Sequence, residues 1–509
     1  MTKHNKVLFL NDLISKVGSL RKEGKIVVQS HGIFDLIHPG IIKHLNEAKE
    51  QGDILIVTVI KDKDVRRGPG RPIFPENFRV ENVSSLEQVD YVCLVDDEIP
   101  FSCVKSIKPD VFAKGQAYKE RDIKIHDKIF EEEKEFYFGK SKIYETGGFS
   151  FSSSQIINNF LDIYPNETKN FLKKFSDKYG FDEIVEKLNS LKKLKVIIIG
   201  DGIIDEYHYC EPMGKSAKSP IIVNKYLNHE VFAGGAFIIA NHIAGLCDKV
   251  QLVSLLGKEE SREDFIVNNL KPNIGTKFFY RDDGPTVCKK RYINLNQKVF
   301  EINYLNNVYI NGSCELDVIN YLKSTISEYD LVLISDFGHG FITNNIINAI
   351  KDFSKIFAVN TQTNAANAGF NMITKYNNPN FVCLDEIEVR LGTQDRFGDI
   401  EDIAKKLSNM LNADGLIVTL GKKGSIGVNS ANEINRTPVF STKVIDTVGA
   451  GDAFFAFAAP CFAHGMPLNL VSFIGNAAGA LAVQIVGNKK PVEKYELLEF
   501  INAMLKHSP

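Results

Sequence analysis

The chain has 509 residues, which is too long for one hydrophobic core and therefore predicts two domains. Hydrophobic residues make up 44% of it and charged residues 24%; these values are typical of globular proteins, so we expect no long disordered tract. The formal net charge of −2 gives no electrostatic reason to expect a nucleic acid or an anionic membrane as partner, so small-molecule ligands are expected instead.

We expect a cytoplasmic location, because the sequence shows no targeting signal and its cysteine pattern is typical of reduced thiols. No apolar core of the kind found in signal peptides follows Met1–Lys6, and no apolar run approaches the ~20 residues needed to span a bilayer. The eight cysteines include no CxxC pair, so we expect reduced thiols and no zinc site.

A compact βαβ unit is predicted near the N-terminus. Lys25–Ser30 is typical of a strand, Gly40–Gln51 of a helix and Asp53–Ile60 of a buried strand. The loop before the helix brings His38 close to the helix N-terminus, where phosphates bind and an imidazole can donate a hydrogen bond to them. Taken alone, a histidine at such a position is more often a helix cap or a packing residue than a catalytic one.

Several motifs in this half resemble those of one enzyme family. They are GIFDLIHPG, GDILIVTVIKD, RRGPGRPIF, LEQVDYV and KPDVFAKGQAY, within about residues 25–160. Together they resemble the cytidylyltransferase-like nucleotidyltransferases, especially the transferase domain of bifunctional heptose-phosphate kinase and heptose-1-phosphate adenylyltransferase enzymes. The resemblance implies a Rossmann-like domain that joins ATP or CTP to a sugar 1-phosphate and releases diphosphate.

The same resemblance implies the site residues. His38 is the catalytic residue, and the nucleotide is bound by Gly32, Phe34, Asp35, Gly40, Arg79, Lys114, Ser152, Ser153 and Ser154. Arg66, Arg67 and Arg71 are further candidates to balance the departing charge. Each of these cationic side chains could instead be a solvated surface charge.

One position departs from the family motif HxGH. The chain has HPGI, so Ile41 stands where the second histidine belongs. Isoleucine cannot donate a hydrogen bond, and losing one such donor to a transition state costs roughly a hundred- to a thousand-fold in rate. His44 is no substitute in the predicted helix, because it points about 120° away from His38. A slow domain, an inactive one and a binding or assembly module all stay open.

Residues 161–194 contain no flexible linker pattern. Glu167–Lys178 and Phe181–Leu194 show helical periodicity and predict a helical connector. The expected organisation is therefore a nucleotidyltransferase domain at residues 1–160, this connector, and a second domain at residues 195–509.

The second domain begins with a buried strand predicted at Val196–Gly200. Two alternating segments follow, Ser219–Glu230 and Thr286–Asn303, and Leu416–Gly421 (LIVTLG) predicts a further strand. Within the second alternating segment, Lys289 and Arg291 share one face by the two-residue period of a strand. On spacing alone this face could equally be an exposed basic surface.

The most informative motif is DTVGAGD at Asp446–Asp452. The extended β-branched segment Thr442–Ile445 leads into a glycine-rich turn that begins a helix, so free N–H groups and the positive helix end create an anion site. Asp452, in the first helical turn, could take a proton from an attacking hydroxyl while the anion site holds the transferring phosphoryl group. A capped helix after a glycine turn is the plain alternative.

This motif resembles the signature of the ribokinase-like (PfkB) carbohydrate kinases, and the likeness extends over about residues 195–505. It implies an α/β domain with a small β-lid at the two alternating segments, through which we expect a homodimer. It also implies Asp452 as catalytic base and an anion hole of Gly449, Ala450 and Gly451. Substrate binding is implied for Asp205, Gly234, Gly235, Lys289 and Arg291, and nucleotide binding for Thr419, Gly421 and Gly424.

Three positions depart from the kinase pattern. Ile238 replaces an asparagine after the di-glycine segment, and His339 replaces a lysine after the central acidic turn. The metal-proximal NxxE motif becomes Cys383–Glu386, which keeps the acid; Glu386 is therefore the residue expected near Mg²⁺. These changes leave Asp452 in place but put the exact sugar in doubt.

The sequence therefore predicts a bifunctional enzyme of nucleotide-sugar synthesis. The C-terminal domain would use ATP to phosphorylate a sugar or sugar phosphate resembling a heptose phosphate, and the N-terminal domain would transfer a nucleotidyl group. One alternative is a carbohydrate kinase with a degenerate N-terminal domain that serves binding or assembly, and Ile41 supports it. Another is a nucleotide sensor without turnover, and the intact DTVGAGD motif argues against it.

Overall fold

The computed structural model describes residues 6–65, 70–96, 102–115, 141–147, 164–294, 297–441 and 443–505. The chain divides into two compact units, Met1–Val185 with Leu498–Pro509, and Glu186–Leu497. The division falls within two helices, α9 (Phe181–Ser190) and α18 (Lys494–Leu505), so each of them has residues assigned to both units. The predicted boundaries at residues 160 and 194 stay predictions. Among the described residues, no helix has the length and apolarity needed to cross a membrane.

The first unit is built on a parallel sheet with strand order β3-β2-β1-β4-β5. Its elements are α1 (Leu10–Lys22), β1 (Val27–Gly32), α2 (Pro39–Lys49), β2 (Ile54–Ile60), α3 (Glu76–Ser84), β3 (Tyr91–Val95), α4 (Ser102–Ile107), β4 (Val111–Gly115), β5 (Lys142–Thr146) and α8 (Asn166–Lys178). The predicted βαβ unit is confirmed as β1, α2 and β2. Because the strand order reverses at β1, a ligand crevice is expected at the carboxyl end of this strand.

Hydrophobic clusters lie on both faces of this sheet. Val27 joins a cluster with side chains of α1 and α4, whereas Val28 joins one with side chains of α2 and α3. Successive strand residues point to opposite faces, so a continuous apolar run such as Ile54–Ile60 supplies both clusters.

The second unit contains a larger sheet of nine strands within the described residues, in the order β10-β9-β6-β13-β14-β15-β16-β17-β18. Its strands are β6 (Lys195–Gly200), β9 (Lys249–Gly257), β10 (Ile274–Arg281), β13 (Leu331–Asp336), β14 (Phe357–Thr361), β15 (Phe381–Asp385), β16 (Gly415–Thr419), β17 (Ser425–Asn429) and β18 (Ile434–Thr437). The strands from β10 to β16 are parallel, and β17 and β18 continue the sheet antiparallel.

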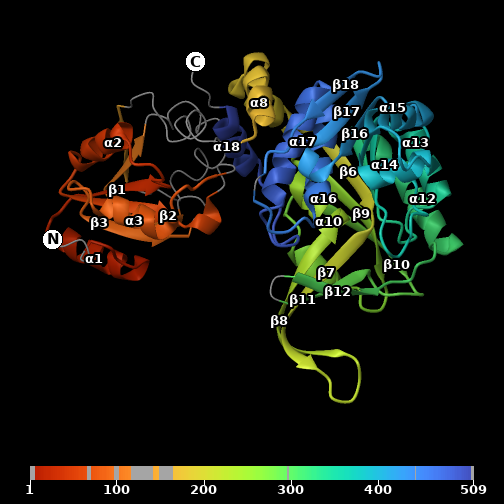
Figure 1. Cartoon of the computed structure of the whole chain (residues 1–509), viewed down its shortest axis with the longest axis horizontal. Helices are drawn as coiled ribbons and strands as arrows, with labels where there is room; N and C mark the ends of the chain where they lie inside the picture. Colours follow the sequence, from red (N-terminus) through yellow and green to blue (C-terminus); the bar gives the residue numbers. More distant parts are fainter. Residues whose placement is uncertain are drawn as a thin grey trace. The chain divides into compact units, whose positions relative to one another are not determined.

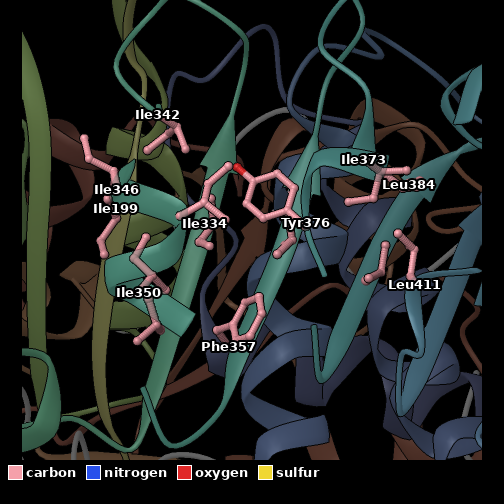
Figure 2. Close-up of a cluster of buried hydrophobic side chains, with 14 of the residues drawn as sticks. Ile199, Ile334, Ile342, Ile346, Ile350, Phe357, Ile373, Tyr376, Leu384 and Leu411 are labelled. Atoms are coloured by element: carbon pink, nitrogen blue, oxygen red, sulfur yellow. The ribbon is translucent and has the colours of Figure 1, made fainter. Parts of the chain in front are cut away.

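Helices cover both faces of this sheet. They are α10 (Ala236–Ala244), α11 (Glu263–Asn268), α12 (Gly312–Thr325), α13 (Asn344–Phe353), α14 (Glu386–Thr393), α15 (Ile400–Leu411), α16 (Ala450–Ala463) and α17 (Leu468–Ala482). Figure 2 shows the core on one face, where Ile346 and Ile350 of α13 pack near Ile199 and Ile334 of the sheet. On the other face, α16 packs against α10 and α17. Its residues Ala453–Cys461 are buried all round, as expected for a helix that is apolar on every side.

A second sheet forms the predicted lid, with strand order β12-β11-β7-β8. Its strands are β7 (Gly202–Lys215), β8 (Ile222–Gly235), β11 (Cys288–Asn294) and β12 (Gln297–Tyr304). The hairpin of β7 and β8 projects from the rest of the unit in Figure 1. The two predicted alternating segments correspond to β8 and to β11 with β12. The lid strand β7 has no counterpart in the prediction, because its first half is uniformly buried and lacks alternation.

Candidate functional site

The loop before α16 is held in place by Asp446. This buried carboxylate accepts hydrogen bonds from the backbone N–H of Val448 and Gly487, from the hydroxyl of Tyr207 at 2.8 Å and from the ammonium of Lys298 at 2.6 Å. Tyr207 and Lys298 belong to the lid, so this one side chain joins the lid to the start of α16. The residues just before the loop, 443–445, lie outside both sheets of the unit.

The predicted anion hole is the N-terminus of α16. Gly449 is the N-cap, with φ of 82°, a conformation that glycine adopts without strain. A Cβ on Gly449 would overlap the side-chain oxygen of Asn488, whereas a Cβ on Gly451 would meet nothing within 4 Å. Gly451 is exposed and leaves room for an anion at this helix N-terminus, where the N–H of Ala450 donates over 3.4 Å to the carbonyl of Thr447.

Asp452 lies one residue further on and is 6% exposed. Burial and the nearby Asp205 raise the pKa of Asp452 to about 7, and a hydrogen bond from Gln362 and the charge of Lys289 oppose this rise. The Gln362 amide donates to Oδ1 of Asp452 at 2.9 Å. The carboxyl group is thus close to half ionised at neutral pH, as suits a general base.

Asp205 of β7 faces the same region. It accepts hydrogen bonds from Nη1 of Arg291 and, at 3.1 Å, from Nδ2 of Asn488. A Cβ on Gly234 would overlap Oδ2 of Asp205, and Gly235 has φ of 58° beside the backbone of Asp201. Glycine is therefore required at both positions of the di-glycine segment for the chain to pass this close.

Lys289 and Arg291 share a face of β11, as the sequence predicts. Their partners on β7 are Asp205 and Tyr207, and Arg291 also forms an ion pair with Glu301 at 2.8 Å. Lys289 is 8% exposed, its ammonium lies 5.7 Å from the centre of the Phe337 ring, and burial lowers its pKa. Among the described residues, the ammonium of Lys289 has no hydrogen-bond or ion-pair partner, whereas its backbone belongs to the lid sheet.

His339, the departure after the central acidic turn, lies next to this face. Its backbone N–H donates to Asp201 Oδ2 at 3.3 Å, and its ring is parallel to that of Phe337 within 7°. Neither ring nitrogen has a hydrogen-bond partner within the described part of the chain. Burial and Lys289 lower the pKa of His339 to about 3, so the ring is neutral.

The residues assigned to the nucleotide lie at the carboxyl end of β16. The hydroxyl of Thr419 donates to the carbonyl of Leu384 at 3.3 Å. Gly421 and Gly424 both have positive φ; space around Gly421 is open, whereas a Cβ on Gly424 would overlap the backbone of Thr437. Gly424 therefore shapes the turn between β16 and β17, and nucleotide contact stays a prediction for all three residues.

Glu386, assigned to the metal, begins α14. Its Oε1 accepts from both Nε and Nη2 of Arg390, at 3.0 and 2.8 Å. Glu388 is more deeply buried, forms a capping box with Asp385, and burial with the charge of Asp385 raises its pKa to about 8. No group of three acidic, histidine or cysteine side chains converges on one point in the described residues.

In the first unit, His38 is the N-cap of α2. Its Nδ1 accepts from the N–H of Gly40 at 3.2 Å, and burial lowers its pKa. Ile41 packs against the hydrophobic cluster of the sheet. His44 is held by Ser30 at 2.8 Å and Thr146 at 2.7 Å, and burial lowers its pKa to about 4.

The loops around His38 are organised by two buried charged residues. Asp35 accepts from the N–H groups of Ile73 and Phe74 at 2.8 and 2.9 Å. Arg79 is fully buried, and its guanidinium donates to the carbonyls of Phe74, Ile33 and Ile60 and to Asp62. Both residues hold the loops together, and direct nucleotide contact by either stays a prediction.

The remaining predicted residues of this unit are positioned as follows. Gly32 ends β1, and Phe34 follows it with φ of 53°. Lys114 is buried on β4, next to β1. Ser152, Ser153 and Ser154, together with Arg66 and Arg67, lie outside the described residues.

Two residues that the sequence did not predict for the site, Gln362 and Asn488, contact predicted site residues. Neither lies in a recognisable motif. The signal that could have located Gln362 is its position directly after a buried strand, Phe357–Thr361, because the carboxyl ends of parallel strands surround the ligand in such folds.

Comparison with known proteins agrees with this geometry. The model of the pfkB family carbohydrate kinases matches residues 193–494, and the model described as cytidylyltransferase-like matches residues 30–159. The bifunctional protein HldE of Trichlorobacter lovleyi is 25% identical over 300 residues, covering 58% of this chain and 60% of that protein. HldE of Nitratiruptor sp. is 44% identical over 114 residues, 22% of this chain and 24% of that protein.

The chain thus spans about three fifths of the length of the first of these curated relatives. Among solved structures, a mutant of phosphofructokinase-2 from Escherichia coli superposes with a TM-score of 0.50 at 15% identity, covering 61% of this chain and 99% of that one. This likeness confirms the predicted α/β fold of the second unit. Since the pfkB model matches more than half of the sequence, the chain belongs to the pfkB family of carbohydrate kinases.

Proposed function

We propose that the second unit transfers the γ-phosphoryl group of ATP to a hydroxyl group of a sugar that already carries a phosphate, similar to a heptose phosphate. The observation that carries the proposal is the buried carboxyl of Asp452, with a pKa raised to about 7 by burial and Asp205, in the first turn of α16 beside Gly449–Gly451. A base that titrates near neutral pH is thereby placed next to a helix N-terminus suited to an anion.

In the proposed reaction, the acceptor hydroxyl gives its proton to Asp452 as its oxygen attacks the γ-phosphorus. The bond from this phosphorus to the oxygen bridging it to the β-phosphate breaks, and ADP leaves with that oxygen. The N–H groups at the start of α16 stabilise the charge on the transferring group. Asp205 would orient the acceptor by accepting hydrogen bonds from its other hydroxyls.

The charges on the face of β11 that carries Lys289 and Arg291 support an acceptor sugar that already carries a phosphate. Arg291 is neutralised by Asp205 and Glu301, whereas Lys289 is buried and has no ion pair among the described residues. An unpaired buried ammonium is costly, and a phosphate would compensate it. Lys289 is therefore the residue proposed to select a phosphorylated sugar.

Magnesium fits this site through few protein ligands. In phosphoryl transfer Mg²⁺ is held mainly by phosphates and water with one or two carboxylates, so a three-residue cluster is not required. Glu386 would hold it, because Arg390 occupies one carboxylate oxygen and leaves the other. When bound, the ion would neutralise negative charge on the phosphates.

For the first unit we propose nucleotidyl transfer from ATP or CTP to a sugar 1-phosphate, with His38 as the group that contacts the phosphates. Support comes from the cytidylyltransferase-like match and from the position of His38 at the switch point of the sheet. With Nδ1 used as the cap of α2, Nε2 is the nitrogen that would face the ligand. We further propose a cytoplasmic homodimer that assembles through the lid.

Phosphorus NMR tests both activities in the full chain, with ATP, CTP, Mg²⁺ and a panel of heptose and hexose phosphates. ADP with a sugar bisphosphate is expected from the second unit, and diphosphate with a nucleotide sugar from the first. Asp452→Asn should abolish only ADP formation, and His38→Ala only diphosphate release. ADP formation without diphosphate, even with a sugar 1-phosphate present, would indicate a kinase with an inactive N-terminal unit. The absence of both products would refute the proposal.

A further inference from the structure

Gln362 reaches the predicted base from a different element. It directly follows β14, and its amide donates at 2.9 Å to Oδ1 of Asp452 in the first turn of α16. Its backbone is fixed on both sides: the N–H donates to the carbonyl of Asp336 at 2.8 Å, and its own carbonyl accepts from Nδ2 of Asn367 at 2.9 Å. The side chain is therefore presented from a rigid strand end.

A neighbouring amide fixes which way the Gln362 side chain faces. The Nδ2 group of Asn360 donates to the carbonyl of Cys383 at 2.8 Å, which leaves Oδ1 of Asn360 toward Gln362 at 3.4 Å from its Nε2. A carbonyl can only accept, so the orientation of Asn360 is set, and Gln362 must point its NH₂ group at both acceptors. A flipped amide would place Oε1 of Gln362, which cannot donate, against both Oδ1 of Asn360 and the Asp452 carboxylate.

The hydrogen bond from Gln362 makes the two carboxylate oxygens of Asp452 inequivalent. Oδ1 is occupied by Gln362, whereas Oδ2 has no side-chain partner within the described residues. Held at one oxygen, the carboxylate cannot rotate freely about its Cβ–Cγ bond. Oδ2 is therefore held in one orientation, in which it can accept a hydrogen bond or a proton.

We propose that Gln362 is a positioning residue for the kinase base: it anchors Oδ1 of Asp452 so that Oδ2 meets the acceptor hydroxyl. The inference rests on the proposed kinase function of this unit. The same hydrogen bond favours the ionised carboxylate, against the burial and the charge of Asp205 that raise the pKa of Asp452. Among the described residues, the other charged or titratable groups that interact with the Asp452 carboxyl are Lys289 of β11, Cys383 of β15 and Glu388 of α14.

The test is the pH dependence of the kinase reaction in Gln362→Met, which keeps the length of the side chain but cannot donate. Loss of one hydrogen bond to a charged group predicts a fall in kcat of about tenfold at pH 7, with KM values within about twofold. The acidic limb of the pH profile should move upward by about one pH unit, so the loss shrinks at high pH. Gln251→Met, a glutamine of β9 outside the site, is the matched control.

A merely structural role would lower activity equally at every pH, and an unmoved acidic limb would overturn the proposal. Should Gln362→Met fail to fold, Gln362→Glu carries the test, because a second negative charge beside Asp452 should move the limb upward still further. An unmoved limb in that variant would overturn the proposal equally.

A measurement without substrate separates this inference from the proposed function. In full-length protein with ¹³C-labelled aspartate carboxyls, the Asp452 signal, assigned by its loss in Asp452→Asn, should titrate near pH 7 and shift upward in Gln362→Met. Absence of kinase activity with every acceptor would refute the proposed function alone. An identical titration in wild type and variant would refute the role of Gln362, whatever the activity.

Discussion

Asp452 combines two properties that oppose each other, ionisation and burial. A carboxylate removed from water is disfavoured, and Asp205 adds like-charge repulsion, so its pKa rises to about 7. A carboxyl group with this pKa is present in both forms at neutral pH, and it binds a proton more strongly than an exposed aspartate does. These properties suit the proton transfer proposed for Asp452, and its burial lowers the stability of the fold when the group is ionised.

We expect Asp452→Asn to remove activity and to stabilise the second unit. Kinase kcat should fall about 100- to 10,000-fold, the usual range for a lost general base. Above pH 7 the variant should resist unfolding better than wild type, because the wild-type carboxyl is ionised there while buried and asparagine is not. Kinetics and urea unfolding at pH 8 measure both, and ATP binding by calorimetry should be preserved. Activity close to wild type would exclude Asp452 as the base.

Arg79 is a buried charged residue whose guanidinium donates its hydrogen bonds to acceptors within the protein. We expect Arg79→Met to destabilise the first unit by roughly 3 kcal/mol, because three carbonyls and Asp62 lose their donors. Hydrogen exchange monitored by mass spectrometry would follow this unit separately. Arg21→Met, at a partly exposed arginine of the same unit, should change stability by less than about 0.5 kcal/mol. A raised KM for the nucleotide with unchanged exchange would instead indicate direct binding.

At the scale of elements, the start of α16 depends on close packing against Asn488. Gly449 and Gly465 both have positive φ, 82° and 78°, but only a Cβ on Gly449 would overlap a neighbour. We expect either alanine variant to cost about 1–2 kcal/mol for the left-handed conformation. Gly449→Ala should lose stability beyond this and lower kcat at least 100-fold, while Gly465→Ala keeps its activity.

Thermal unfolding and kinase assays of the two variants make the comparison direct. Adding Asn488→Ala to Gly449→Ala removes the overlapping side chain and should recover part of the stability. Equal effects of the two glycine substitutions would mean that the contact with Asn488 has no role.

The lid is joined to the loop before α16 by Asp446, which binds both Tyr207 and Lys298. Lys298 of β12 forms an ion pair with Asp446 at 2.6 Å, close to the predicted anion hole. We expect Lys298→Met to lower kcat/KM for the sugar about tenfold, mainly through KM, because the lid loses a link to the loop. Lys290→Met, which removes a lysine that pairs with Glu206 on the opposite face, is the control. Equal kinetics for both variants would contradict a link through Asp446.

For the whole molecule, the two units should respond oppositely to pH. In the second unit the pKa values of Asp201, Asp452 and Glu388 are raised by burial and by neighbouring carboxylates, to about 7, 7 and 8. These groups bind protons more tightly in the folded than in the unfolded state, so unfolding releases protons, and stability falls as pH rises from about 4, the ordinary carboxyl pKa, to about 8. In the first unit burial lowers the pKa of His44 to about 4, so its stability falls as pH drops from 6.5 to 4.5.

Because the chain contains no tryptophan, hydrogen exchange by mass spectrometry is the measurement that reports on each unit separately. The stability of the second unit should be lower at pH 8.5 than at 6.5, and that of the first lower at pH 4.5 than at 6.5. Equal slopes in both units would show that these buried groups do not control the pH dependence.

What the sequence determined by itself is local in the chain. The βαβ unit, the turn and helix at Asp446–Asp452 and the shared face of Lys289 and Arg291 all follow from periodicity and glycine placement over a few residues, and the structure confirms them. What only the tertiary structure decided is which side chains meet. Gln362 reaches Asp452 from 90 residues away, and Asn488 reaches Asp205 from 283. Such contacts depend on which strand ends the sheet order brings together, and no local pattern records that order.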